Sequence, residues 1–208
     1  MFCTTFSRSC QSLRTGIRGS QVGIATRPPI KSVSLSGHAS GQSDGNESNS
    51  GASSDTVSHG MMRTLTRTIP VRSSKHTQFV DITDQVAQAV ASSGVSDGFV
   101  VVYSRHTTSR IHINEHEPLL LQDLGLLLER LVPRDAFYHH DDFSVRTVNL
   151  TPGERVNGHS HCRGLFIGAS EHIPVTDGMM MLGRWQRVFM VELDGPQTRE
   201  VAVKVVGV

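Results

Sequence analysis

The sequence predicts an α+β fold: one compact domain, with a mainly antiparallel sheet packed against a few helices, behind a polar leader. Strand-like segments gather at both ends of residues 61–208, around one long leucine-rich segment, and do not alternate regularly with helices. A parallel sheet would need that alternation. Residues 61–208 also have the length of a single domain with its own core. Residues 1–60 differ from them sharply in composition.

The leader has the composition of an organelle transit peptide. Residues 1–43 hold five basic residues and no acidic one, and serine and threonine are frequent. This pattern is typical of transit peptides and not of secretory signals. Residues 36–60 continue as a polar linker with too few apolar side chains to offset the entropy of ordering, so we expect disorder. We expect mitochondrial import of the chain. Plastid import and a cytoplasmic protein with a disordered tail are the alternatives.

The composition of the whole chain excludes several classes of protein. A formal net charge of +1 is not the charge balance of a nucleic-acid-binding protein. We expect no membrane span, since no run of about 18 apolar residues occurs. Cys3 and Cys10 lie in the leader, which leaves Cys162 without a disulfide partner inside the domain.

Three strands are expected in the first part of the domain. Residues 63–71 (RTLTRTIPV) alternate polar and apolar side chains like a half-buried strand. Pro70 favours a position at the sheet edge, because proline cannot donate a ladder hydrogen bond. Residues 76–83 (HTQFVDIT) predict a neighbour of that strand. Residues 98–104 (GFVVVYS) form a continuous apolar run, which predicts a buried strand.

Two helices and a further group of strands complete the prediction. Residues 83–94 place apolar side chains at helical spacing, and Gly94 is a stop signal. Residues 117–133 predict the longest helix, with Pro118 in its first turn and leucines over one broad face. Residues 170–208 predict three or four strands, joined by turns at Asp-Gly pairs.

Polar residues gather where the first apolar run ends. Eight of the eleven histidines fall between His106 and His172. His106, Thr107 and Thr108 follow the buried strand directly, a place where a rigid element commonly positions reactive side chains. The alternative is that the threonines satisfy the turn backbone and His106 is simply exposed.

A second polar cluster is YHHDD, residues 138–142. A histidine beside an aspartate can be a metal ligand whose second ring nitrogen is held by the carboxylate. Such a run can equally be a solvated loop. The sequence leaves both interpretations open.

The third cluster is NGHSHCRGLFIG, residues 157–168. Asn157 is a good N-cap for a short helix, whose first N–H groups would form a site for phosphate. On a helix, His159 and His161 point about 200° apart, so they cannot both face one metal. Cys162 has no partner at the spacing of a cysteine zinc site, and we interpret it as a small buried apolar residue.

Five segments, taken in order, resemble the YjbQ-like family, labelled secondary thiamine-phosphate synthase. They are HTT at 106–108, INE at 113–115, the segment 131–142, NGHSHC at 157–162, and the segment 173–199. The resemblance covers the whole folded region. It implies a compact α+β domain that assembles as a homotrimer. It also implies a polar pocket near a subunit boundary, lined by histidines and able to hold a metal.

The resemblance also implies roles for individual residues. The expected metal ligands are His106, His140 and His161, with zinc as the best fit for three imidazoles and an open coordination position. The expected catalytic residues are Glu115, Asn114 and Thr107. The expected substrate-binding residues are Thr108, Asn157, Gln186 and Arg110. Arg110 and Arg184 stand where the family usually has small residues.

The function implied by the resemblance is that of a metal-assisted transferase. It would join a hydroxymethylpyrimidine diphosphate to a thiazole phosphate with release of pyrophosphate. One alternative is a trimeric metal- or ligand-binding protein without turnover, and another is a metal-dependent hydrolase of a phosphorylated metabolite. In each case we expect a small phosphorylated partner, and neither nucleic acid nor membrane.

Overall fold

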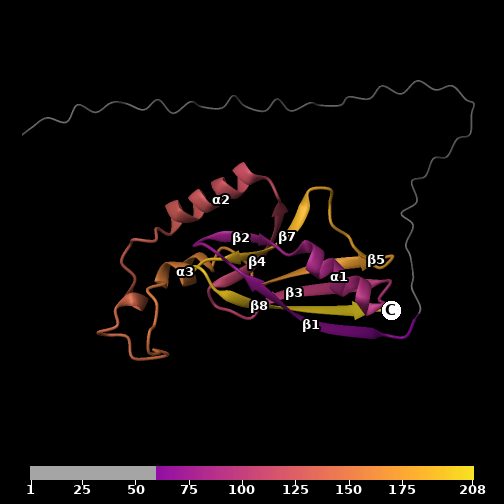
Figure 1. The fold of residues 1–208 in the computed structure, drawn as a ribbon, viewed down its shortest axis with the longest axis horizontal. Coiled ribbons are helices and arrows are strands. Elements are labelled where there is room, and N and C mark those ends of the chain that lie inside the picture. Colours follow the sequence, from indigo (N-terminus) through magenta and orange to yellow (C-terminus); the bar gives the residue numbers. More distant parts are fainter. Residues whose placement is uncertain (1–59) are drawn as a thin grey trace, which may run out of the picture. The chain divides into compact units, whose positions relative to one another are not determined.

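The computed structural model describes residues 60–208, which contain two antiparallel sheets and three α-helices (Figure 1). The strands are β1 (Arg63–Arg72), β2 (Gln78–Asp81), β3 (Gly98–Ser104), β4 (Ser109–Glu115), β5 (Ser170–Thr176), β6 (Met179–Met180), β7 (Gln186–Glu192) and β8 (Thr198–Gly207). The helices are α1 (Thr83–Ser93), α2 (Pro118–Leu131) and α3 (Gly158–Arg163), with one 3₁₀ turn, η1 (His139–Asp141). The predicted α+β class is confirmed. The leader falls outside the described residues, so its import and disorder stay predictions.

The larger sheet has the strand order β1-β8-β3-β5-β6. Its edge strand β1 pairs with β8 over its whole length, and Pro70 lies there as predicted. β3 lies between β8 and β5, with Val100 and Val102 fully buried. The predicted buried strand is confirmed for one face only, because Phe99 and Tyr103 alternate with these valines and are 44% and 45% exposed.

The smaller sheet has the order β2-β7-β4. β2 was expected beside the strand at residues 63–71, and this is wrong, because β2 pairs with β7. α1 packs Val86, Ala89 and Val90 into the core shared with the larger sheet. Gly94 ends α1 in the left-handed conformation, at a φ of 68°, as predicted.

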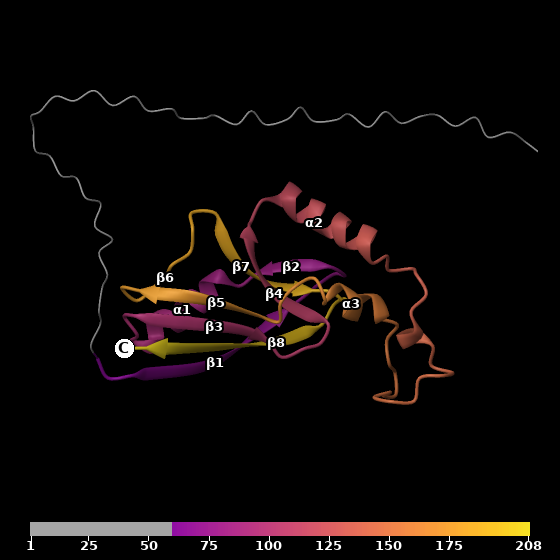
Figure 2. The same cartoon turned by 180° about the vertical axis from the view of Figure 1, so that it is seen from behind.

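α2 lies on the outside of the domain, as the two opposite views show (Figure 1, Figure 2). Glu117 caps it, accepting from the N–H groups of Leu119 at 2.9 Å and Leu120 at 2.6 Å. Leu128 is the one fully buried side chain of α2, and it packs in a small cluster with Phe189 of β7. The predicted leucine face is therefore only partly covered in the described part of the chain. None of the helices in residues 60–208 is long and apolar enough to cross a membrane.

Candidate functional site

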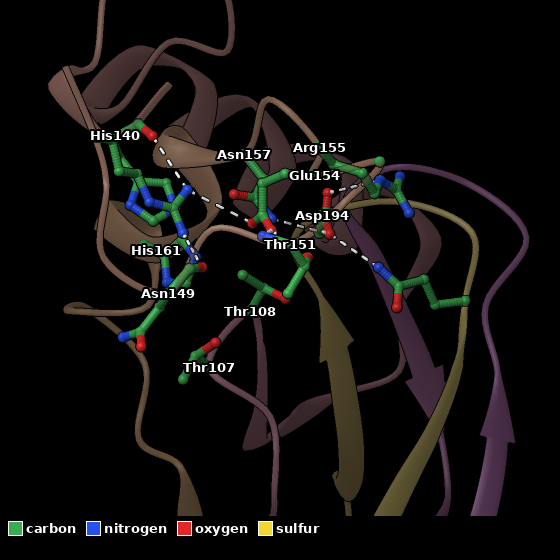
Figure 3. Close-up of a pocket in the computed structure, with 13 residues that line it drawn as sticks. Thr107, Thr108, His140, Asn149, Thr151, Glu154, Arg155, Asn157, His161 and Asp194 are labelled. Atoms are coloured by element: carbon green, nitrogen blue, oxygen red, sulfur yellow. Dashed lines mark hydrogen bonds and ion pairs between the residues drawn. The ribbon is translucent and has the colours of Figure 1, made fainter. Parts of the chain in front are cut away.

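A polar cavity of about 510 Å³ lies where five segments meet (Figure 3). The turn between β3 and β4 supplies Thr107 and Thr108, and η1 supplies His140. The loop from 142 to 156 contributes several polar side chains, Arg146 and Glu154 among them. α3 and the residue before it supply His161 and Asn157, and the segment after β7 supplies Asp194 and Gln197. The fold thus brings together three clusters that are distant in sequence.

His140 and His161 form a pair in this cavity. Their ring centroids are 4.5 Å apart and the rings are tilted by 59°. Arg146 Nη1 lies 3.1 Å from His140 Nε2. A guanidinium can only donate, so that ring nitrogen accepts, and neutral His140 carries its proton on Nδ1.

The second histidine of the pair is held neutral. Burial lowers the pKa of His161, and the neighbouring His140 and Arg146 lower it further. Within the described residues, its ring nitrogens make no hydrogen bond. His161 therefore presents a neutral imidazole with a free lone pair to the cavity at physiological pH.

The start of α3 differs from its prediction. Asn157 occupies the N-cap position, but its side chain makes no capping bond. Instead, Asp141 Oδ1 accepts from the N–H groups of Asn157 at 3.0 Å and Gly158 at 2.8 Å. The expected phosphate site at this helix start is therefore wrong, because a carboxylate of the protein already occupies it. The helix is short, as predicted, and ends at Arg163.

His159 points away from His161, as helical geometry predicts. Its Nε2 lies 2.7 Å from Nε2 of His76, and its ring is almost completely buried. Cys162 is half-buried and unpaired, not fully buried as expected.

A buried ion pair supports one wall of the cavity. Arg199 donates to Glu192 through Nε at 2.7 Å and Nη2 at 2.6 Å, and its Nη2 also donates to Thr108 Oγ1 at 3.0 Å. Glu192 Oε1 accepts from the N–H of Asp194 at 3.0 Å. Asn157 Nδ2 in turn donates to Asp194 Oδ2 at 3.4 Å. The pair therefore fixes Thr108 and Asp194, which both line the cavity.

His106 lies outside this cavity. It lines a neighbouring hollow of about 370 Å³ together with Arg110, and its Nε2 accepts from the N–H of Glu200 at 3.0 Å. No group of three metal-ligating side chains converges within residues 60–208. The expectation that His106, His140 and His161 converge on one metal within a single chain is wrong, because His106 lines a different hollow from the other two. The lone pairs of His106 and His140 also already accept hydrogen bonds. Zinc binding stays a prediction.

Three further predicted site residues lie at the far end of the smaller sheet. Glu115 of β4 pairs with Gln186 of β7, and Asn114 precedes them in the ladder. At about 3.4 Å per residue, this end of β4 lies about 17 Å from Arg110. Asn114, Glu115 and Gln186 line neither hollow described above, so their expected place in one pocket with Asn157 is wrong for a single chain.

Sequence reasoning missed several residues of the cavity. Arg146 and Glu154, 3.6 Å apart, lie in a loop without any periodic pattern that would have drawn attention to them. For Asp194, the Asp-Gly pair predicted a turn but gave no sign that its side chain lines the cavity. The one available signal was the surplus of polar residues in the loop. Arg184, by contrast, stacks over Trp185 at 4.6 Å and does not line the cavity.

Comparison with known proteins gives the family. A profile described as "UPF0047 protein YjbQ-like" matches residues 67–208. The chain belongs to the YjbQ-like UPF0047 family. A UPF0047 protein of Methanothermobacter thermautotrophicus is 40% identical over 146 residues, which cover 70% of this chain and 94% of that protein. One of Archaeoglobus fulgidus is 38% identical over 136 residues, covering 65% of this chain and 97% of that protein.

The fold of the YjbQ-like domain agrees with a solved structure. A YbjQ-like protein of unknown function from Sulfolobus solfataricus matches with a TM-score of 0.64 and 32% identity, covering 71% of this chain and all of that one. The relatives are named only as UPF0047 proteins, and the solved structure is described as one of unknown function. The expectation of thiamine-phosphate synthase activity is therefore wrong, because membership of this family does not support it.

Proposed function

We propose that this YjbQ-like chain is an enzyme that transfers protons to and from a small polar metabolite bound in the larger cavity. One observation carries the proposal: His161 is a neutral imidazole that lines the cavity beside His140, and its ring nitrogens make no hydrogen bond within residues 60–208. A general base works best when it is unprotonated at the working pH and can reach the substrate.

The other cavity residues suit the binding of a polar substrate. Thr108 Oγ1 accepts from Arg199, so its own hydrogen is available for a ligand. His140 carries its proton on Nδ1, while Arg146 holds the other ring nitrogen. We assign His161 the role of the base that takes and returns the proton, and His140 that of a hydrogen-bond donor to the substrate through Nδ1. Thr107, Thr108 and Asn157 are assigned to substrate binding.

The test begins with the purified full-length chain and a pool of polar metabolites, whose depletion is followed by mass spectrometry. His161→Gln should slow the consumption of any substrate found by about 100-fold or more, the usual contribution of a general base. Because the base must be neutral, the rate should fall as the pH is lowered through the pKa of His161, which lies below 6.5.

His172→Gln is the matched control, since His172 is an exposed histidine of β5 outside the cavity. It should retain the wild-type rate. If His161→Gln turns over substrate as fast as His172→Gln, the assignment of the base is wrong. If the wild type consumes no metabolite, the proposal fails.

A further inference from the structure

The guanidinium of Arg110 has no carboxylate partner in the described part of the chain. Its Nε donates to Gly164 O at 3.0 Å, and its Nη1 donates to the backbone oxygens of His106 at 3.2 Å and Ser109 at 3.0 Å. All three acceptors are neutral carbonyl groups. The side chain is half-buried, and burial lowers the pKa of Arg110. A partly desolvated charge without a counter-ion is costly unless a ligand supplies one.

The bonds of Arg110 leave one end of its guanidinium free. Nη2 makes no hydrogen bond within residues 60–208, and it lies where a Cβ on residue 164 would be. Gly164 therefore leaves the space that the guanidinium needs. The backbone carbonyls fix the plane of the group, so Nη2 is held ready to donate before any ligand arrives.

The hollow beside Arg110 offers donors to a ligand. His106 Nε2 accepts from Glu200, so the neutral ring carries its proton on Nδ1, which makes no hydrogen bond in the described residues. No aspartate or glutamate lines this hollow. The carboxylates that act on His106 are already paired, Glu192 with Arg199 and Glu200 with Arg105 at 3.4 Å. A cationic hollow lined by donors suits an oxyanion.

This hollow adjoins the larger cavity. Thr107 lines both. Arg110 also interacts electrostatically with His161. Burial lowers the pKa of His161 most, followed by His140 and Arg146, and the charge of Arg110 lowers it further. A ligand anion at Arg110 would therefore lie within reach of a substrate at His161.

We propose that Arg110, with His106 and Thr107, forms an oxyanion subsite that holds the phosphate or carboxylate group of the substrate. This proposal rests on the proposed function in one respect: the anionic group bound at Arg110 is part of the substrate on which His161 acts. The substrate is then an anionic metabolite whose reacting part lies beyond Thr107, in the larger cavity. Because Nε and Nη1 are already engaged, the anion meets the guanidinium end-on through Nη2.

The test is calorimetric titration of the full-length chain with inorganic phosphate and, separately, with succinate, which distinguishes the two kinds of oxyanion. Arg110→Gln should weaken binding of the preferred anion by at least about tenfold, the contribution of one charge-assisted hydrogen bond. Arg110→Lys should fall between wild type and Arg110→Gln, because a point charge replaces an oriented donor. Arg72→Gln is the matched control, since Arg72 is an exposed arginine on β1 and its loss changes the net charge equally.

The outcomes separate this proposal from the proposed function. His161→Gln should lose turnover but bind the anion with a dissociation constant within about twofold of that of the wild type. If the assignment of His161 as the base is wrong, the measured anion binding at Arg110 is still valid. Equal weakening in Arg72→Gln and Arg110→Gln, or no saturable binding of either anion by the wild type, overturns the subsite. If Arg110→Gln does not fold, Arg110→Lys and His106→Gln carry the comparison, and wild-type affinity in both overturns it as well.

Discussion

At the scale of single residues, a hydrogen bond between His76 and His159 fixes which ring nitrogens carry protons. Ser160 Oγ donates its hydrogen to Leu193 O at 2.6 Å, so it accepts from His159 Nε2 at 3.0 Å. His159 Nε2 therefore carries a proton, which also points to His76 Nε2. The proton of His76 is then on Nδ1, facing Thr77 Oγ1 at 2.9 Å. The bond between the two rings lasts only while His76 is neutral, because a proton on His76 Nε2 would face the proton of His159.

This pair should make stability depend on pH. Burial, followed by the charge of Arg134, lowers the pKa of His76 from 6.5 to about 4. Between those values the unfolded chain binds the proton and the folded chain does not, so the free energy of unfolding should fall as the pH drops from 6.5 towards 4. Urea unfolding at pH 7 and pH 5 measures this. His76→Gln should have a flatter pH dependence, and curves parallel to wild type would contradict the assignment.

The buried pair of Glu192 and Arg199 gives a second prediction at this scale. Glu192→Gln keeps the shape but leaves the guanidinium of Arg199 buried without its counter-charge, and should lower the free energy of unfolding by about 3 kcal/mol. Glu200→Gln breaks the exposed pair with Arg105 and should change it little. Denaturant titration of both variants measures how much free energy of unfolding each one loses. Equal losses would show that burial does not determine the contribution of an ion pair here.

At the scale of elements, the sequence predicts features set by neighbouring residues, such as helix ends, but not which strands pair across a long stretch of chain. α1 and its end at Gly94 follow from neighbouring residues, because apolar spacing and a left-handed glycine act within a few positions. The partner of β2 is β7, more than 100 residues later, and nothing in residues 76–83 specifies it. The same holds for the site. Helical geometry separates His159 from His161, but only the tertiary fold places His106 in a different hollow from His140.

Two glycines allow a prediction about elements. Gly125 lies within α2, and a Cβ there would meet no atom within 4 Å. Gly125→Ala should therefore raise the free energy of unfolding by about 0.5–1 kcal/mol through helix propensity and a more restricted unfolded chain. Gly98→Ala is the contrasting variant, since its Cβ would collide with Val206 O of β8 and should destabilise the sheet. Thermal unfolding compares them. A loss of stability in Gly125→Ala would contradict the open surroundings of that position.

At the scale of the whole molecule, α2 exposes an apolar surface. Leu119, Leu126 and Leu131 are 66%, 59% and 53% exposed. Contiguous apolar side chains of this kind commonly mark an interface between proteins. The homotrimer implied by the family resemblance would give this surface a partner, and it stays a prediction.

Sedimentation equilibrium tests this assembly. We expect a mass of three chains for the wild type and a smaller mass for Leu126→Glu, because a charge on α2 would have to be desolvated in the interface. Met179→Glu is the control. Met179 of β6 is also highly exposed, at 68%, but it lies on the larger sheet, whereas α2 packs against β7 of the smaller sheet. A wild-type monomer at micromolar concentration would refute the homotrimer, and dissociation by Met179→Glu alone would place the interface elsewhere.

The carboxylate of Asp141 makes two backbone amides into reporters of the site. It holds the N–H groups of Asn157 and Gly158, so the turn that carries His140 and the helix that carries His161 separate only when those bonds open. Hydrogen exchange at these two amides therefore measures how often the histidine pair comes apart, without knowledge of any substrate. A ligand that bridges the pair should slow exchange at both positions together, and a ligand held elsewhere should leave it unchanged.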